Sequence, residues 1–225
     1  MPNASRRFTL RDAFLEFIRH PSPLFLTGLF FGCWILRGTE GGALTGKEWM
    51  AIAGVLLYWP FQEWWMHRVL LHLPPIELGG RSVELDFAKK HRLHHADPTH
   101  LPLIFLPLPT VVVSLVVFSS IAGALSDWAL SFIFVFMGTA SFSTLLYEWT
   151  HYLTHSRYLP QTAFFKRIWK QHRWHHYKNE KYWYSFTVPH IDGWMGTGPQ
   201  VSTVPKSPTA RTLGRTPDGE RVSAE

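Results

Sequence analysis

Ten of the 13 histidines in this chain fall in four short stretches, and this clustering points to metal chemistry. Neutral imidazole is the commonest side-chain ligand for metal ions. Histidines that converge without cysteine or alternating carboxylates suit iron, zinc, copper or nickel rather than magnesium or calcium. The sequence therefore predicts a metalloprotein. The four stretches are His67-Arg-Val-Leu-Leu-His72, His91-Arg-Leu-His94-His95, His151-Tyr-Leu-Thr-His155 and His172-Arg-Trp-His175-His176.

The spacing within each stretch indicates how the imidazoles could be presented. In the two His-x-x-His-His motifs, offsets of three and four put the first histidine beside both others on one helical face, so three rings could point one way. His151 and His155 form an i, i+4 pair, which can also reach one ion. His67 and His72 are five apart, about 140° around a regular helix, so we expect the helix to loosen near His72.

Ten ligands are too many for one ion, because roughly four to six coordination positions saturate it. We therefore expect two ions with about five histidines each. Their uncompensated positive charge calls for water-derived hydroxide or oxide, or for nearby carboxylates. Glu63 and Glu148 can each share a helical face with a histidine and, with Asp97, are candidates to support the ligands; interfacial solvated acids are an equally good reading. The remaining histidines read as structural: His20, His100 and His190.

The composition indicates a membrane protein of one domain. The 225 residues leave no room for a separate reductase module. Charged residues make up only 17% of the chain, against roughly 25% in average soluble proteins, and 46% are hydrophobic. The net charge of +6 accompanies no nucleic-acid motif, so a membrane surface is the better partner than a nucleic acid. The single cysteine, Cys33, excludes an intramolecular disulfide and a thiolate metal site.

Four apolar stretches are candidate membrane spans. Only the last reaches the roughly 20 residues that a bilayer core needs, so the others must be completed by flanking aromatic residues or be tilted. Short links join the first pair and the second pair, which predicts two helical hairpins open toward the same side. The expected fold is an all-α integral membrane protein: four transmembrane helices in two hairpins, with a cytoplasmic helical cap that carries the dimetal site. The stretches are Leu24–Leu36, Trp49–Phe61, Thr110–Leu125 and Trp128–Tyr147.

Lysine and arginine counts predict the orientation. The 22 basic residues divide as 4 before the first stretch, 2 in the first hairpin loop, 5 in the middle segment, 0 in the second hairpin loop and 11 after the last stretch. By the positive-inside rule, both termini, the middle segment and all ten clustered histidines are cytoplasmic. The membrane would be the endoplasmic reticulum in a eukaryote and the inner or plasma membrane in a bacterium.

Three segments are expected along the chain. Residues 1–23 read as a cytoplasmic or interfacial segment, in which Phe14, Leu15, Phe17 and Ile18 suggest a short amphipathic helix. Residues 24–196 form the membrane domain with the histidines. Residues 197–225, rich in Gly, Pro, Ser and Thr, are expected to be disordered and dispensable for chemistry.

The four motifs in this order, on two hairpins, resemble the fatty acid hydroxylase superfamily, a membrane di-iron group that includes sterol desaturases, sterol methyl oxidases and carotenoid hydroxylases. The resemblance runs from about Trp59 to Gly196. The four residues between His67 and His72 are similar to the fatty acid 2-hydroxylases, whereas the sterol enzymes usually have three. The stretch ending His94-His95-Ala-Asp97-Pro98 and the ending Trp194-Met-Gly-Thr197 also resemble the 2-hydroxylase branch.

This resemblance implies an O2-dependent oxidoreductase that uses two electrons to hydroxylate a fatty acyl chain at carbon 2. It implies two iron ions, with zinc possible as purified, since an all-histidine site accepts zinc readily. No fused b-type cytochrome domain is present in the sequence, so electrons are expected from a separate ferredoxin, or b-type cytochrome, with its reductase. The resemblance makes ligands of all ten clustered histidines: His67, His72, His91, His94, His95, His151, His155, His172, His175 and His176.

A lipid substrate suits a site at the membrane surface, because an acyl chain can slide between apolar helices while its head stays at the interface. The candidate channel walls are Trp64, Trp65, Trp183, Phe186 and residues 101–108. A basic collar surrounds the fourth motif and could dock an acidic electron carrier or contact anionic lipid head groups. It comprises Arg167, Lys170, Arg173, Lys178 and Lys181.

Other functions remain open at this point. Within the superfamily, the chain could be a sterol or carotenoid hydroxylase or desaturase. A dizinc enzyme could hydrolyse a lipid ester or amide with metal-bound hydroxide, although the lack of carboxylate ligands counts against it. A non-enzymatic electron carrier could use the histidines as axial ligands of b-type haem, but such ligands normally sit inside a helix bundle and not in threes beyond it.

Overall fold

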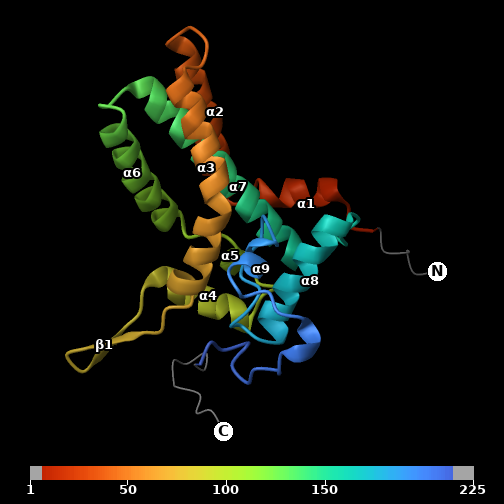
Figure 1. Ribbon diagram of the computed structural model, residues 1–225. Coiled ribbons are helices and arrows are strands. Elements are labelled where there is room, and N and C mark those ends of the chain that lie inside the picture. Colours follow the sequence, from red (N-terminus) through yellow and green to blue (C-terminus); the bar gives the residue numbers. More distant parts are fainter. Residues whose placement is uncertain (1–6, 215–225) are drawn as a thin grey trace.

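A computed structural model describes residues 7–214, and its architecture is almost entirely helical (Figure 1). Four long helices form a bundle: α2 (Pro21–Thr39), α3 (Gly46–Trp65), α6 (Leu108–Leu125) and α7 (Leu130–His155). Shorter elements gather at one end of the bundle as a cap (Figure 1). They are α1 (Leu10–Phe17), the π-helix η1 (Met66–Leu71), α4 (Asp86–Ala96), α5 (Leu101–Ile104), α8 (Ala163–Tyr177), α9 (Ile191–Trp194) and the 3-10 turn η2 (Val201–Thr203). An antiparallel hairpin of β1 (Ile76–Leu78) and β2 (Arg81–Val83) projects from this end.

Helix α7 is the central element, because it packs against α2, α3 and α6. Its buried face is built from small residues, which allow helices to approach closely. A Cβ atom at Gly138 would lie 2.9 Å from the indole nitrogen of Trp34 on α2. The hydroxyls of Thr139, Ser141 and Ser143 donate to backbone carbonyls four residues earlier, at 2.7, 2.7 and 3.0 Å. These polar groups are therefore satisfied within the helix and do not need water.

The α2–α3 hairpin is closed by an ion pair at the end of the bundle away from the cap. The Arg37 guanidinium donates from Nε and Nη2 to the two carboxylate oxygens of Glu48, at 2.5 and 3.0 Å. It also donates to the carbonyl oxygens of Gly41 and Ala43 in the connecting turn. Glu48 in turn completes a capping box with Thr45 at the start of α3. One arginine thus joins the end of α2, the turn and the start of α3.

The α6–α7 connection is a tight turn at residues 126–129. Asp127 and Trp128 have positive φ angles of 51° and 62°, the left-handed region that ordinary residues rarely adopt. The Trp128 ring folds back onto α6 and covers Gly123, where any side chain would collide with the indole. The contact between Trp128 and α6 therefore stabilises the unfavourable backbone conformation of the two residues that reverse the chain.

Two helical stretches are long and apolar enough to cross a membrane, Leu101–Leu125 and Leu130–His155. They correspond to the third and fourth of the four expected spans. Helices α2 and α3 form the expected first hairpin, although they do not meet the same length and hydropathy test. The fourth span and the His151/His155 motif prove to be one continuous helix of 26 residues, so the bundle carries two histidines directly into the cap.

The expected short helix near the N-terminus is present as α1, which is capped by Thr9 and Asp12. Its Phe17 ring packs against Trp149 and Tyr152 of α7, with ring centroids 5.0 and 5.8 Å away. Residues 1–6 lie outside the described part of the chain.

The C-terminal segment differs from the expectation of disorder. Residues 197–214 follow a defined path along the cap, whereas residues 215–225 lie outside the described residues. Pro199 accepts a hydrogen bond from the indole of Trp183 at 3.2 Å, and the Ser207 amide donates to the Lys178 carbonyl at 2.7 Å. A composition rich in Gly, Pro, Ser and Thr disfavours regular helix, but here tertiary hydrogen bonds satisfy the irregular backbone.

Candidate metal centre

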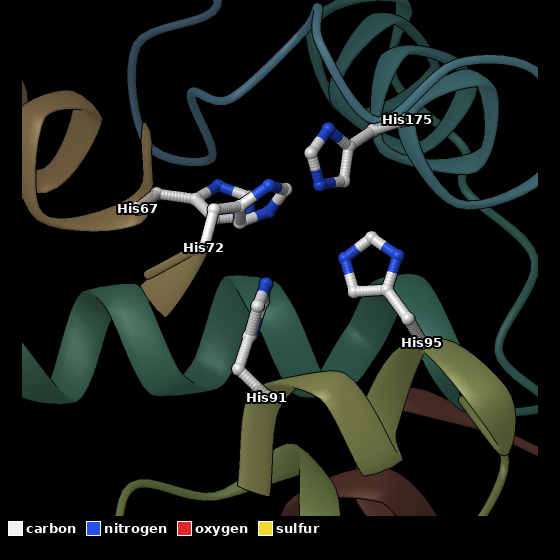
Figure 2. Close-up of side chains that lie close together, drawn as sticks. All are labelled: His67, His72, His91, His95 and His175. Atoms are coloured by element: carbon white, nitrogen blue, oxygen red, sulfur yellow. The ribbon is translucent and has the colours of Figure 1, made fainter. Parts of the chain in front are cut away.

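The ten clustered histidines converge as two groups of five. In each group, one nitrogen per ring lies within 4.8 Å of the corresponding nitrogen of every other ring. This division matches the expectation of two ions with five histidines each. Figure 2 shows the first group, whose rings point into a common space from η1, α4 and α8. The first group is His67, His72, His91, His95 and His175; the second is His94, His151, His155, His172 and His176.

The five-residue step from His67 to His72 is accommodated by a π-helix. Residues Met66–Leu71 form η1, which directly continues α3. A π-helix hydrogen-bonds from i to i+5, so residues five apart come onto one face. The two ring centroids are accordingly 5.1 Å apart. The expected loosening of the helix is present, and it extends over Met66–Leu71, with His72 as the residue that directly follows η1.

The two His-x-x-His-His motifs each divide between the two groups, contrary to the expectation that three rings point one way. On α4, His91 and His95 join the first group while His94 joins the second. On α8, the i, i+4 pair joins the second group and His175 joins the first. Neighbouring residues on a helix are about 100° apart, so adjacent histidines face opposite sides of the seam between the groups. The His95 ring stacks on that of His176 at 4.1 Å across this seam.

The nitrogen separations in the second group fit shared metal ligation. The Nε2 atom of His94 lies 3.1 Å from Nε2 of both His151 and His155, and His155 Nε2 lies 2.6 Å from that of His172. Two imidazole nitrogens bound at right angles to one ion, with bonds of about 2.1 Å, stand about 3.0 Å apart. The spacing is therefore close to what a common ion requires.

In the first group, backbone carbonyls accept hydrogen bonds from three rings, on the side of each ring that faces away from the group. The Nδ1 atoms of His67, His95 and His175 donate to the carbonyl oxygens of residues 184, 210 and 182, at 2.6, 2.8 and 2.7 Å. A carbonyl oxygen can only accept, so the proton is on Nδ1 and the Nε2 lone pair is free. Within residues 7–214, these Nε2 atoms are buried without a hydrogen-bond partner, as are those of His72 and His91. Unpartnered, converging lone pairs are the arrangement that a metal ion satisfies.

Burial keeps the cap histidines neutral. Desolvation is the largest cause of the lowered pKa of His91, His172, His175 and His176, and neighbouring histidines lower the pKa of each further. Burial also lowers the pKa of His95 to about 3. Imidazole binds a metal only in its neutral form, so these rings are ready as ligands at pH 7.

The three carboxylates that we expected beside the ligands have other partners. Glu63 accepts hydrogen bonds from the Phe186 amide at 2.5 Å and from the amide and hydroxyl of Thr187. Glu148 accepts from the Ser22 hydroxyl and the Leu106 amide, and exposed Asp97 accepts from Thr99. No hydrogen bond joins any of the three to a clustered histidine within the described residues. Glu63 instead fixes the loop that carries Phe186, whose ring stacks on His67 at 4.9 Å.

A buried carboxylate that sequence reasoning missed is Asp192. It accepts hydrogen bonds from the amides of Tyr184 and Ser185 at 2.9 Å and from the Thr197 hydroxyl at 2.7 Å. These bonds hold the loop whose Tyr184 carbonyl accepts from His67. Burial raises the pKa of Asp192. Nothing in its local sequence signals this role, because two of these three partners are backbone amides, which every residue but proline carries.

An apolar cavity of about 580 Å³ lies beside the first group, between α3, η1, α6 and α7. His67 and Tyr147 lie at its end near the histidines, and Ala140 and Phe118 line it further along α7 and α6. None of the four expected channel aromatics is among its lining residues. Trp64 donates to Thr197 at 2.8 Å, Trp65 is exposed, and Trp183 and Phe186 are buried in the cap. Of the stretch 101–108, Leu106 lines the cavity.

The three remaining histidines stay outside both groups, as expected. His20 stacks on Phe105 at 4.0 Å, while His100 and His190 are exposed. His190 contacts Arg167, whose Nη1 lies 3.4 Å from the ring.

Comparison with known proteins identifies relatives for this architecture. A family model described as fatty acid hydroxylase matches residues 52–197. The chain is 26% identical over 176 residues to the dihydroceramide fatty acyl 2-hydroxylase FAH2 of Arabidopsis thaliana, covering 77% of this chain and 71% of the relative. It also matches the solved structure of full-length Scs7p, in which only the hydroxylase domain is visible, with a TM-score of 0.66 and 22% identity. That match covers 83% of this chain and 68% of Scs7p, and shows a shared fold.

Proposed function

The chain belongs to the fatty acid hydroxylase family, and on that premise we propose that it is a membrane di-iron enzyme that hydroxylates a fatty acyl chain at carbon 2. The observation that carries this proposal is the convergence of ten histidines, eight of them buried and two half-buried, into two groups of five beside an apolar cavity. The 2-hydroxylase reading draws on the name of the Arabidopsis relative and on the four residues between His67 and His72.

Each group of five would hold one ion. Bound iron would supply the redox chemistry that uses O2 and two electrons to oxidise a C–H bond, which redox-inert zinc cannot do. The protein keeps the imidazoles neutral and directs one nitrogen of each ring toward the ion that its group would hold. Three backbone carbonyls fix the tautomers of His67, His95 and His175. Phe186 packs on His67, His151 and His172, with ring centroids 4.6 to 4.9 Å away, and excludes water from that side.

The cavity supports an acyl substrate. Its volume of about 580 Å³ falls in the range of roughly 300 to 1,000 Å³ that is typical of small-molecule sites. Since His67 belongs to both the cavity wall and the first histidine group, a chain in the cavity would meet the centre at one end. Reaction at carbon 2 requires the carboxyl end of the chain to lie there. The methyl end would then extend between α6 and α7 toward Ala140.

We also place the bundle in the membrane as four spans, with the cap and both termini cytoplasmic. Large apolar side chains remain exposed along all four long helices, more than the surface of a soluble protein usually carries. Examples are Leu24, Phe31 and Ile35 on α2, Met50 and Leu57 on α3, Val113 and Val116 on α6, and Leu130 and Phe142 on α7. The positive charge of the cap and its absence from the α6–α7 turn support the same orientation.

Electrons would come from a separate protein, a ferredoxin or a b-type cytochrome with its reductase. Arg167, Lys170 and Arg173 are exposed on α8, the helix that supplies three of the histidines. An acidic carrier that docks there would lie next to the second group. Electrostatic attraction of this kind increases association rates and weakens with salt.

Lipid profiling with a ligand variant and a matched histidine control tests the function. Cells that produce the chain should gain 2-hydroxy acyl lipids, and His175→Ala should reduce that gain more than about 100-fold, because even groups behind metal ligands cost 10- to 100-fold. His190→Ala should retain it, since His190 is exposed and belongs to neither group. A change in the sterol or carotenoid pool without 2-hydroxy lipids would contradict the proposed substrate.

A further inference from the structure

The described C-terminal segment beyond the family-matched region lies against the metal centre. The family model ends at residue 197, yet the ordered chain continues to residue 214. We call residues 204–213 the C-terminal strap. Its ends are buried or half-buried, and Ala210 in its middle is only 3% exposed.

The strap supplies the hydrogen-bond acceptor for one metal-facing ring. The Ala210 carbonyl oxygen accepts the Nδ1 proton of His95 at 2.8 Å in a buried position. The opposite nitrogen, Nε2, points to the first group. The corresponding acceptors for His67 and His175 are residues 184 and 182, inside the family-matched region. His95 alone among these three depends on the strap.

Two arginines fasten the strap to α4, the helix that carries His95. Arg211 of the strap donates to the carbonyl oxygens of His95, at 2.7 Å from Nε, and of Ala96. These carbonyls are at the C-terminal end of α4, where helical acceptors are unsatisfied. In the other direction, Arg92 of α4 donates from Nη1 to the Leu213 carbonyl at 3.1 Å.

The strap is also anchored on the segment that follows α8. Ser207 donates its amide to the Lys178 carbonyl at 2.7 Å, and the Thr209 hydroxyl donates to the Glu180 carboxylate at 2.6 Å. The strap therefore bridges the exits of the two helices that carry the His-x-x-His-His motifs. A segment that bridges them fixes the seam where His95 stacks on His176.

We propose that the C-terminal strap positions His95 for metal binding, so that retention of the ion in the first group depends on residues outside the region that matches the family model. This inference rests on the proposed metal centre. Groups that accept the outer proton of a ligating histidine fix its tautomer and orientation, and their loss typically costs 10- to 100-fold in metal affinity. Release of the strap should therefore lower the affinity of the protein for one of the two ions by about that factor.

Zinc titration of the metal-free full-length protein tests the proposal without requiring turnover. The test variants are Arg211→Ala and a truncation after Thr203. The matched controls are Lys206→Ala, which removes an exposed strap cation away from α4, and a truncation after Gly214, which keeps the strap. Arg211→Lys retains a cation that can donate to one carbonyl and should recover part of the affinity. Thermal unfolding of each metal-free variant reports its fold separately.

The wild type and both controls should each bind two zinc ions, and the affinity of each site should be the same in all three proteins. In the test variants, the affinity for one ion should fall 10- to 100-fold, while the affinity for the other ion should stay at the wild-type value. Two unchanged affinities in Arg211→Ala and in a folded truncation would overturn the strap proposal. Equal weakening of both ions together with a lower unfolding temperature would also overturn it, because the strap would then be a general clamp. Failure of the wild type to bind two ions would instead reject the proposed metal centre.

Discussion

At the scale of single residues, the centre depends on groups that hold the imidazoles from behind. Backbone carbonyls, and not acidic side chains, accept the outer protons of His67, His95 and His175. Side-chain carboxylates act one step further out, where Glu63 and Asp192 fix the loop at residues 184–187. The acidic residues therefore shape the walls of the site and leave the ligand set neutral.

Substitution of Asp192 tests whether the carboxylates that fix the loop at residues 184–187 also help to orient the histidines. Asp192→Ala leaves the amides of Tyr184 and Ser185 without their acceptor, which should lower the free energy of unfolding by about 1–3 kcal/mol per unsatisfied group. Because the Tyr184 carbonyl orients His67, metal should also dissociate faster from the first group. Chemical denaturation and chelator competition measure the two effects.

Asp97→Ala is the control for that substitution, since Asp97 is exposed and its carboxylate accepts from the neighbouring Thr99 and not from the loop at residues 184–187. It should stay within about 0.5 kcal/mol of the wild type. Equal metal retention in both variants would show that the loop does not need Asp192 to orient His67.

At the scale of elements, each histidine-bearing helix serves the centre through its geometry. The π-helix η1 brings two histidines five apart onto one face, and α4 and α8 each send histidines to both groups. Helix α7 continues from the bundle into the cap, so the cavity and the second histidine group share one rigid element. A substrate in this cavity would thereby be positioned relative to the histidines by a helix and not by a loop.

The far end of the cavity should set acyl chain length. Ala140 lies on α7 eleven residues before His151, or about 16 Å along the helix axis, and is 4% exposed. Ala140→Phe fills this end and should reduce hydroxylation of the longest acyl chains by about tenfold or more relative to shorter ones. Mass spectrometry of the hydroxylated lipids measures the shift.

Leu146→Phe adds a ring to the same helix at a position that is 43% exposed and outside the cavity lining, so it controls for bulk. It should leave the chain-length profile unchanged, and both variants should retain their metal. An unchanged profile in Ala140→Phe would mean that the chain does not occupy this cavity.

The Arg37–Glu48 pair should stabilise the α2–α3 hairpin without affecting the centre. Arg37→Met leaves the Glu48 carboxylate buried without its partner, so the unfolding temperature should fall while the metal content stays at the wild-type value. The double variant Arg37→Met/Glu48→Leu removes both charges and should recover part of the loss. Loss of metal in the single variant would contradict this separation.

The pair also gives a pH dependence with a defined sign. Hydrogen bonds from Arg37 lower the pKa of Glu48 from 4.5 to about 2. A carboxyl group with a depressed folded-state pKa contributes stability that is fully present above about pH 4.5 and is lost as the pH falls toward 2. The free energies of unfolding of the wild type and of Arg37→Met should therefore converge as the pH falls through that interval.

At the scale of the whole molecule, the cap and the bundle carry different kinds of side chain. The bundle carries exposed apolar side chains and the cavity, while the cap carries the histidines and most of the basic residues. With the proposed membrane placement, a lipid would approach from the bilayer and an electron carrier from the aqueous side.

Cysteine labelling tests the proposed orientation. In a Cys33→Ala background, Ser126→Cys in the α6–α7 turn should react with a membrane-impermeant maleimide in intact cells. Lys206→Cys in the strap should react only after permeabilisation, because the proposed orientation puts the cap in the cytoplasm. The reverse pattern would invert the topology, and reaction of both positions in intact cells would exclude a membrane between them.

Residue types and spacing in the sequence were sufficient to predict that the ten histidines converge, that they divide by five, and that four long helices accompany them. These features depend on local periodicity and composition, which can be determined from the sequence alone. The family follows from the same motifs and is confirmed by the match over residues 52–197. The carboxylates beside the ligands and the aromatic channel walls were predicted at positions where the structure shows other contacts.

Only the tertiary structure decided which histidines lie in the same group, where the cavity lies and what holds the rings in place. The split of each His-x-x-His-His motif depends on how α4 and α8 face each other, which helical spacing alone does not determine. The carbonyls of residues 182, 184 and 210 have no signature in their side chains, because every residue carries a carbonyl group. For the same reason, composition did not reveal that residue 210, in a segment expected to be disordered, supplies the carbonyl that accepts from His95.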